Sequence, residues 1–192
     1  FPSPNGIVPA KTPWTSPTNA ESATIELRTP DSRDAAAVYG LVIRSGVLDA
    51  NSPYCYLLLC RDFAATSLVA EASDKIVGFV AAYRPPSRPE TLFVWQIGVD
   101  ARARRRGLGR RLLEGLLQLP ACAGITHVEA TVTPSNIASR RLLENFAKTL
   151  GATCVFDASA GFPAPLFGDA GHEQEDCVRI GPFAVVGEAA AP

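Results

Sequence analysis

Residues 99–113 read Val99-Asp-Ala-Arg-Ala-Arg-Arg-Arg-Gly-Leu-Gly-Arg-Arg-Leu-Leu113, and this run carries the clearest structural pattern in the sequence. The residues before it, 91–99, are β-branched and aromatic and predict a strand, whereas the leucines at 108, 112, 113 and 116 have helical spacing. An arginine and glycine turn therefore joins a strand directly to a helix. Glycines let the main chain approach a ligand closely, and free N–H groups at a helix N-terminus bind phosphate oxygens. The turn, Arg104-x-x-Gly107-x-Gly109, is predicted to hold a pyrophosphate, with further hydrogen bonds from its arginines.

Other phosphate loops and a nucleic-acid surface are the alternatives to this interpretation. The segment has neither the GxxxxGK(S/T) pattern of a Walker loop nor the GxGxxG pattern of a Rossmann fold. Six arginines lie among residues 102–111, but a nucleic-acid-binding domain usually carries further basic stripes. The formal net charge of the chain is -1, which disfavours nucleic acid and an anionic membrane as partners.

Length and composition predict one globular domain between two tails. The chain has 192 residues, of which 47% are apolar and 19% charged, as is ordinary for a single domain. Five prolines among residues 1–23 predict a mobile tail, and residues 185–192 look similar. The globular domain is expected over residues 24–184. Because the chain lacks Met, Phe1 is not expected to be the translation start.

The cysteines predict neither a zinc site nor a disulfide framework. There are five, at irregular spacings and without a CxxC pair, whereas zinc sites need ligands paired at short spacing. Reduced and partly buried thiols are typical of cytosolic proteins. We therefore expect a cytoplasmic protein without a bound metal.

The order of the predicted elements indicates a mixed α/β sheet with helices on its faces. Strands are predicted at 24–28, 68–72, 76–83, 91–99 and 127–133. Helices are predicted at 35–45, at 107–119 and from Ser135 or Asn136 to about residue 150. Ser73 and Asp74 are expected to form the turn of a hairpin.

The segment 99–113 resembles motif A, Q/R-x-x-G-x-G/A, of the GNAT N-acetyltransferases. The resemblance implies an α/β GNAT fold, with a mixed, mostly antiparallel twisted sheet, helices on both faces and a splayed central strand pair. It implies acetyl-CoA as the co-substrate, whose pantetheine arm would pair with the main chain of Ile97 and Val99. The Val99 N–H would then polarise the thioester carbonyl and stabilise the developing oxyanion.

The same resemblance implies the remainder of the coenzyme site. The residues that would hold the pyrophosphate are Arg104, Arg105, Arg106, Gly107, Leu108, Gly109 and Arg110. Asn136 and Ser139 resemble motif B, whose polar groups meet the coenzyme at the start of a helix. Many relatives carry a Tyr seven residues after this Asn, which protonates the leaving thiolate, but this chain has Leu143 there. A different acid must act, or the thiolate leaves unaided.

Four further segments, at 49–60, 83–96, 133–136 and 171–175, narrow the resemblance. Together they resemble the diaminobutyrate acetyltransferases of the ectoine pathway, a route to osmoprotection, and the likeness runs from about residue 27 to 183. It implies that L-2,4-diaminobutyrate and acetyl-CoA react directly, in a ternary complex, to give N4-acetyl-L-2,4-diaminobutyrate and CoA. It also implies a homodimer.

This narrower resemblance implies which residues meet the amine. Those expected to line its pocket are Asp49, Trp95, Asn136 and Glu175, with Tyr54 and His172 close by. Asp49 and Glu175 are expected in loops, where binding groups often lie. The substrate carries two ammonium groups and one carboxylate, so carboxylates suit its site. Glu175 or His172 would accept the amine proton, and Tyr54 would protonate the departing thiolate.

Each of these residues also has a purely structural interpretation. Asp49 can cap a turn, Trp95 can belong to the core, and Asn136 is a good helix N-cap by itself. The alternative functions are a GNAT enzyme with another amine acceptor, a non-catalytic acyl-CoA-binding sensor and a nucleic-acid-binding module. An enzyme acting on a small amine requires that Asp49 and Glu175 converge near Trp95.

Overall fold

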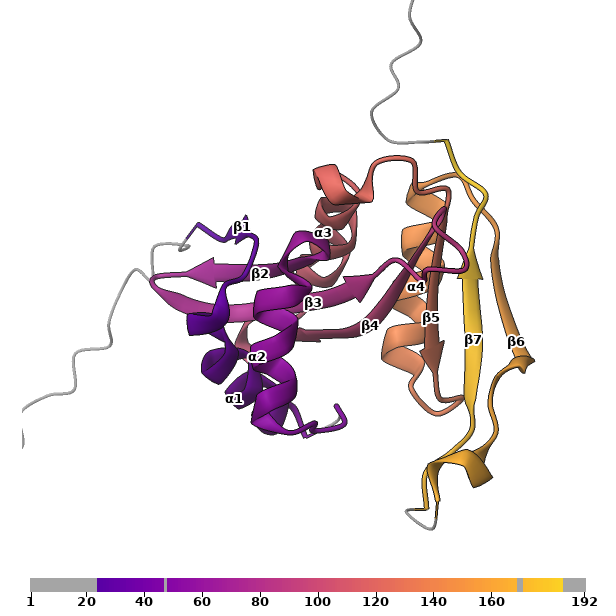
Figure 1. Cartoon of the computed structure of the whole chain (residues 1–192), viewed down its shortest axis with the longest axis horizontal. Helices are drawn as coiled ribbons and strands as arrows, with labels where there is room; N and C mark the ends of the chain where they lie inside the picture. The colour runs from indigo at the N-terminus through magenta and orange to yellow at the C-terminus, as the bar shows by residue number, and fades with distance from the viewer. Residues whose placement is uncertain (1–23, 47, 169–170, 185–192) are drawn as a thin grey trace, which may run out of the picture.

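The computed structural model of the chain describes residues 24–46, 48–168 and 171–184, and both predicted tails lie outside these ranges. The described residues form one mixed sheet of seven strands. The strands are β1 (Glu26–Arg28), β2 (Ser67–Ala72), β3 (Lys75–Tyr83), β4 (Thr91–Val99), β5 (His127–Val132), β6 (Cys154–Phe162) and β7 (Glu175–Ile180). Their order in the sheet is β1-β2-β3-β4-β5-β7-β6, and every neighbouring pair is antiparallel except β4 and β5 (Figure 1).

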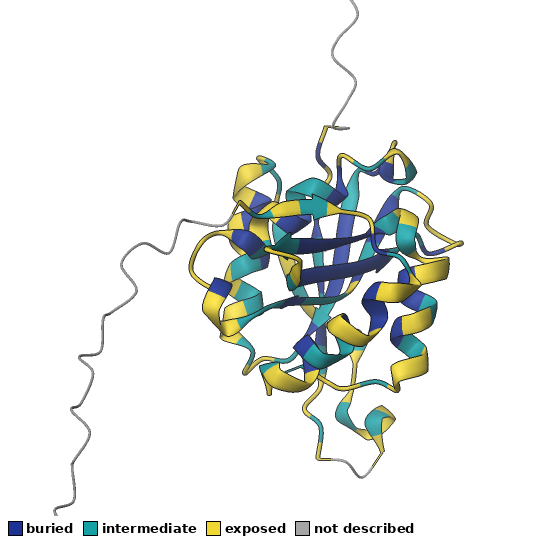
Figure 2. Ribbon diagram, turned by 90° about the vertical axis from the view of Figure 1, so that its left-hand side faces the viewer, coloured by how far each residue is buried: buried dark blue, intermediate teal, exposed yellow. Residues whose placement is uncertain are grey.

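Helices cover both faces of the sheet. Within the described ranges the α-helices are α1 (Ala35–Ser45), α2 (Pro53–Asp62), α3 (Leu108–Leu116) and α4 (Ile137–Thr149). α1 and α2 share a buried cluster with Val69 and Phe79, whereas α3 and α4 share another with Leu68 and Val80. Successive side chains of a strand point to opposite faces, so β2 and β3 contribute to both cores. Figure 2 shows the buried residues concentrated in the central strands, beneath the helices. None of the helices in these ranges has the length and apolar character needed to span a bilayer.

The central strands β4 and β5 splay apart, as predicted. Their parallel pairing is confined to Thr91–Phe93 of β4 and His127–Glu129 of β5, after which the two strands diverge (Figure 1). A bulge lies in β4 at the same point, because Ala81 pairs with Gln96 and Ala82 with Val94, which leaves Trp95 without a partner in β3. The second half of β4 therefore has one edge paired with β3 and the other edge open.

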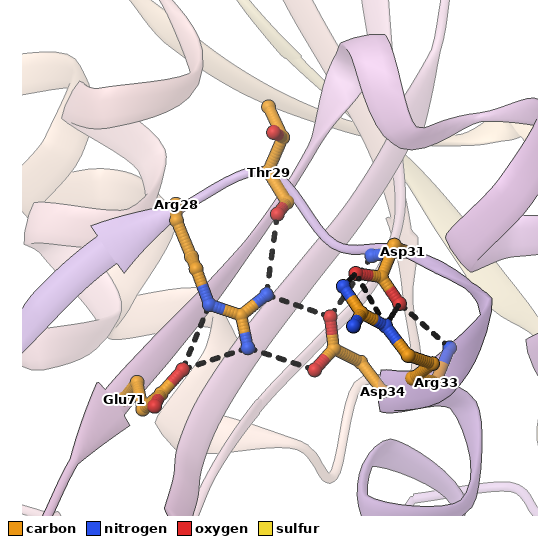
Figure 3. Close-up of polar contacts among 6 residues, drawn as sticks. All are labelled: Arg28, Thr29, Asp31, Arg33, Asp34 and Glu71. Carbon is orange, nitrogen blue, oxygen red and sulfur yellow. Dashed lines mark hydrogen bonds and ion pairs between the residues drawn. The ribbon is translucent and has the colours of Figure 1, made fainter. Parts of the chain in front are cut away.

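An ion-pair network fixes the outer edge of the sheet to the start of α1 (Figure 3). Arg28, at the end of β1, places its guanidinium 2.7 Å from the carboxylates of both Asp34 and Glu71. It contacts both oxygens of Asp34, which precedes α1 directly. This guanidinium holds the pKa of the Asp34 carboxyl below its usual value. Because a two-point contact of this kind fixes orientation, the network sets where α1 begins relative to β1 and β2.

The structure confirms most of the predicted central elements. β4 spans the predicted residues 91–99, and the turn of the β2–β3 hairpin is at Ser73 and Asp74, with φ of 49° and 59°. Asn136 caps α4, since its Oδ1 accepts a hydrogen bond from the Ser139 N–H over 3.1 Å. The helix predicted to reach residue 119 is shorter, because α3 ends at Leu116 and the chain continues in tighter i→i+3 turns.

Asp49 lies in a loop, as expected, but the later part of the segment 49–60 is a helix that the sequence does not predict. α2 begins after Ser52, whose Oγ accepts from the Cys55 N–H over 3.3 Å, and Pro53 takes the first helical position. Its buried residues are Tyr56, Leu59 and Cys60, which have helical spacing. The run of three leucines at 57–59 hides this period, because it places apolar side chains on the exposed face as well.

The strands β6 and β7 are also absent from the sequence prediction, and the expectation that Glu175 lies in a loop is wrong. Glu175 is the first residue of β7. The buried row of β7 is Asp176, Val178 and Ile180, so a charge interrupts its apolar alternation. Arg140 of α4 pairs with Asp176 at 2.9 Å, which explains how a carboxylate is accommodated there.

Candidate active site

A cavity of about 770 Å³ lies beside the open edge of β4, within the volume range of cofactor pockets. The turn before α3 and one side of α4 form its other walls. The predicted coenzyme residues that line it are Ile97, Val99, Arg104, Arg105, Gly107, Leu108, Gly109, Arg110, Asn136 and Ser139. Three separate stretches of sequence therefore meet in one cavity.

Arg106 is the exception among the predicted coenzyme residues. It lines a separate cleft of about 870 Å³, which α1 and the end of β4 help to form. The backbone explains this direction: Arg105 and Gly107 both have left-handed conformations, with φ of 62° and 70°. The chain changes direction on both sides of Arg106, so the structure does not bring this residue to the coenzyme cavity.

The turn before α3 has the form of an anion cradle. Gly107 is the N-cap residue of α3, and its positive φ is a conformation that side chains disfavour. The first bond of the helix runs from the Arg111 N–H to the Gly107 oxygen over 3.0 Å. The N–H groups of Leu108, Gly109 and Arg110 therefore have no helical acceptor and lie at the positive end of the helix dipole. An anion in the cavity would meet these groups and the adjacent arginines.

The open edge of β4 presents main-chain groups to the same cavity. The Asp100 N–H donates to the Val77 oxygen over 2.8 Å, and Val99 lies opposite Gly78. Hydrogen bonds alternate along an antiparallel pair, so the N–H groups of Ile97 and Val99 point away from β3. The Val99 oxygen also points this way, since it accepts a hydrogen bond from Arg104 Nε over 3.1 Å. The strand can therefore pair with an amide-bearing ligand and present the Val99 N–H to it.

A second group of polar side chains brings together residues from two distant stretches of sequence. Nε2 of His172 lies 3.4 Å from Oδ2 of Asp49 and 3.8 Å from Oε1 of Glu175. The His172 ring stacks on Phe167, with a centroid separation of 4.0 Å. The Asp49 side chain is 82% exposed, whereas that of Glu175 is 19% exposed. The cluster is thus open to incoming solute on the Asp49 side and enclosed on the Glu175 side.

The surroundings of His172 favour its protonated form. Nδ1 lies 2.6 Å from the main-chain oxygen of Glu173. This contact, and after it the Asp49 carboxylate, raise the pKa of His172 above its usual value. A carbonyl oxygen only accepts hydrogen bonds, so Nδ1 carries the proton and the lone pair of the neutral ring is on Nε2. The proton-accepting atom of His172 therefore faces both carboxylates.

The same three side chains also have the donor types of a metal site. The nearest ligand atoms of Asp49, His172 and Glu175 all lie within 4.8 Å of one another. The expectation that the protein binds no metal therefore stays a prediction.

Two residues that the sequence reasoning leaves without a role connect this cluster to β4. Gln96 donates from Nε2 to the main-chain oxygen of Asp49 over 2.9 Å. The hydroxyl of Tyr56, a fully buried residue, lies 3.1 Å from Gln96 Oε1 and accepts from the Asn51 N–H over 3.4 Å. In the sequence, the one feature that could have indicated this role is the amide side chain of Gln96 in an otherwise apolar stretch of strand.

Trp95, Tyr54 and Leu143, the other residues considered in the sequence, lie in three different surroundings. Trp95 projects from the bulge of β4 and is 37% exposed, immediately before Gln96. Tyr54 lies in the first turn of α2, is 66% exposed, and makes no hydrogen bond to the cluster among the described residues. Leu143, at the position where many relatives carry Tyr, is buried in the core between the sheet and α4. No proton donor is present at that position.

Comparison with known proteins identifies the class to which this fold and site belong. The profile of the acetyltransferase (GNAT) family matches residues 28–147, more than half of the chain. The chain therefore belongs to the GNAT acetyltransferase family.

Similar proteins within that family are named for one particular substrate. The L-2,4-diaminobutyric acid acetyltransferase of Halalkalibacterium halodurans is 42% identical over 169 residues, which cover 88% of each protein. The one from Streptomyces avermitilis is 46% identical over 156 residues, 80% of this chain and 86% of the relative. A solved structure, diaminobutyrate acetyltransferase EctA from Paenibacillus lautus in complex with L-2,4-diaminobutyric acid and coenzyme A, matches with a TM-score of 0.81. It is 42% identical, and the match covers 86% of this chain and all of that one.

Proposed function

We propose that this chain transfers the acetyl group of acetyl-CoA to the 4-amino group of L-2,4-diaminobutyrate, the acetylation step of ectoine biosynthesis. One structural observation carries the proposal: Gln96 ties the Asp49–His172–Glu175 cluster to β4, the strand whose open edge lines the coenzyme cavity. The names of the relatives at 42% and 46% identity supply the substrate.

The charge of the cluster suits this substrate. Diaminobutyrate carries two ammonium groups, and Asp49 and Glu175 both place a carboxylate near Nε2 of His172. Charge-assisted hydrogen bonds to an ammonium are about twice as strong as neutral ones. Trp95, beside Gln96, offers a large rigid wall for the short aliphatic chain. Asn136 caps α4 at the other side of the coenzyme cavity and would meet the coenzyme and the amine where they join.

His172 is the general base that the geometry favours, and Glu175 is the second candidate. An ammonium has no lone pair, so it must lose a proton before it attacks the thioester. Nε2 of His172, with its lone pair toward both carboxylates, would accept that proton from an ammonium bound between them. The resulting imidazolium would be stabilised by Asp49 and Glu175, at 3.4 and 3.8 Å from Nε2.

The amine then attacks the thioester directly in a ternary complex. The Val99 N–H, pointing into the cavity, would donate to the developing oxyanion, and the alignment of both substrates would supply much of the acceleration. Tyr54 is our candidate to protonate the CoA thiolate, which is also a stable enough leaving group to depart unaided. A covalent intermediate on cysteine is disfavoured, because burial raises the pKa of the Cys55 thiol and brings that of Cys60 to about 11.

We place the enzyme in the cytoplasm as a homodimer that serves osmoprotection. All five cysteines are free, in keeping with a reducing compartment, and acetyl-CoA is supplied there by central metabolism. The dimer follows from the resemblance to the diaminobutyrate acetyltransferases, and analytical ultracentrifugation would test it.

The reaction is tested by measuring thiol release from acetyl-CoA with L-2,4-diaminobutyrate, lysine, ornithine, spermidine and an aminoglycoside, followed by NMR of the product. We expect strong selectivity for diaminobutyrate and acetylation at N4. Release with another amine alone would retain the acetyltransferase and discard the substrate. Acetyl-CoA binding without release for any amine would favour a non-catalytic acyl-CoA sensor.

A further inference from the structure

The coenzyme cavity continues past the pyrophosphate turn toward the C-terminal end of α4. The α4 residues that line it include Ala138, Leu142 and Asn145, which lie on one side of the helix, and then Lys148 in the last turn. Arg110 of α3 lines the same cavity. Neither Asn145 nor Lys148 belongs to the pyrophosphate turn or to the amine cluster, so the extension calls for a separate explanation.

The distance along α4 suits a second phosphate on the same coenzyme. Gly109 of the turn packs against Leu142 so closely that a Cβ on Gly109 would lie 3.2 Å from Leu142 Cδ2. Lys148 follows Leu142 by six residues, about 9 Å along a helix axis. Helical side chains lean toward the N-terminus, so the Lys148 ammonium extends back toward the turn. A group one ribose away from the pyrophosphate would come within its reach.

The charges at this end of the cavity favour a dianion. Lys148 is exposed and has no ion-pair partner in the part of the chain that the structure describes. Arg110, across the cavity, is partly compensated by Glu114 at 3.5 Å. Asn145 adds an amide donor one turn before Lys148. A lysine ammonium is a compact point charge that binds phosphate well.

We propose that Lys148, assisted by Asn145, binds the 3′-phosphate of coenzyme A and makes the enzyme select acetyl-CoA over 3′-dephospho-acetyl-CoA. This rests on the proposed function, because it requires acetyl-CoA in the cavity. It adds a determinant of coenzyme specificity at a position outside the glycine-rich turn.

Isothermal titration with both coenzyme forms tests the subsite in the wild-type chain, in Lys148→Gln and in Arg141→Gln. Arg141 is an exposed arginine of the same helix that does not line the cavity, so it is a control of equal charge change. We expect the wild type to bind acetyl-CoA about tenfold more tightly than the dephospho form, as one charge-assisted contact provides. Lys148→Gln should abolish this preference by weakening acetyl-CoA alone, whereas Arg141→Gln should keep it.

Two results would overturn the subsite. One is a wild type that binds both forms equally, and the other is a Lys148→Gln variant that retains the preference or weakens both forms to the same extent. A wild type that binds neither form would overturn the proposed function itself, so the two failures are distinguishable.

Discussion

Gln96 donates a hydrogen bond from its side-chain amide to the main-chain oxygen of Asp49, over 2.9 Å. Its own oxygen lies 3.1 Å from the hydroxyl of the buried Tyr56. The strand that would polarise the thioester is therefore tied to the segment that carries a carboxylate for the amine. In the proposed enzyme Gln96 is a positioning residue, because it acts on the substrate through Asp49.

Replacing Gln96 should separate the two substrates kinetically. Gln96→Met keeps the length of the side chain but removes its hydrogen bonds, each of which contributes about 1 kcal/mol. We expect the KM for diaminobutyrate to rise about fivefold, with the KM for acetyl-CoA unchanged. Steady-state kinetics with each substrate varied in turn would measure this. Tyr56→Phe, which removes one hydroxyl, should show a smaller change in the same direction, and an equal loss for both substrates would refute the positioning role.

Removing either carboxylate of the cluster should weaken amine use and leave coenzyme binding intact. Asp49→Ala and Glu175→Ala each delete a charge-assisted contact, and we expect the KM for diaminobutyrate to rise by about tenfold or more. Titration with acetyl-CoA should give an unchanged Kd. Asp62→Ala is the control, since Asp62 is an exposed carboxylate that pairs only with its neighbour Arg61 among the described residues. If both cluster variants kept full activity, the amine pocket would lie elsewhere.

The central part of the fold is readable from the sequence because its signals are local. The turn at 104–109 and the strand 91–99 each carry their own pattern, and Asn136 marks the start of α4 by its capping chemistry. β7 is harder, because Asp176 occupies a buried position that only its pairing with Arg140 makes tolerable. That partner is 36 residues away, so no window of sequence contains the reason for the strand.

The candidate site shows the same division between local and distant information. The coenzyme cavity depends on short motifs, and most of its predicted residues do meet there. The direction of Arg106 depends on the left-handed backbone of Arg105, which residue types alone do not predict. The contact between Gln96 and Asp49 spans 47 residues. It arises only when β4 and the loop before α2 are placed together, so a polar residue in an apolar strand is its only local indication.

Substitutions at Gly107 test whether the backbone conformation of the turn before α3 is needed to bind acetyl-CoA. Its φ of +70° suits glycine, and no heavy atom lies within 4 Å of an added Cβ. The cost of Gly107→Val is therefore conformational rather than steric, about 1–2 kcal/mol for the left-handed backbone. We expect the Kd for acetyl-CoA to rise about tenfold, before any change in amine selectivity. Gly107→Asn should be milder, because Asn tolerates this conformation. Equal losses in the two variants would contradict a backbone origin.

The pH dependence of the reaction should identify the base. The Glu173 carbonyl, and then Asp49, raise the pKa of His172 above its usual value of 6.5. A base must be neutral to act, so activity should fall as pH decreases through this raised pKa, and the acid limb of kcat/KM should lie above pH 6.5. The sign for stability is the opposite: protonated His172 stabilises the fold below pH 6.5, and this contribution is lost as pH rises through the raised pKa.

Two variants show whether His172 or Glu175 is the base responsible for the acid limb of kcat/KM. His172→Gln should lower kcat by about 100-fold and remove the limb, whereas a limb that persists would assign the base to Glu175. Asp49→Asn should shift the limb toward lower pH without bringing it to 6.5, because the hydrogen bond to the Glu173 carbonyl, the larger cause, remains. An unchanged limb in Asp49→Asn would mean that the carboxylate at 3.4 Å does not act on the titrating group.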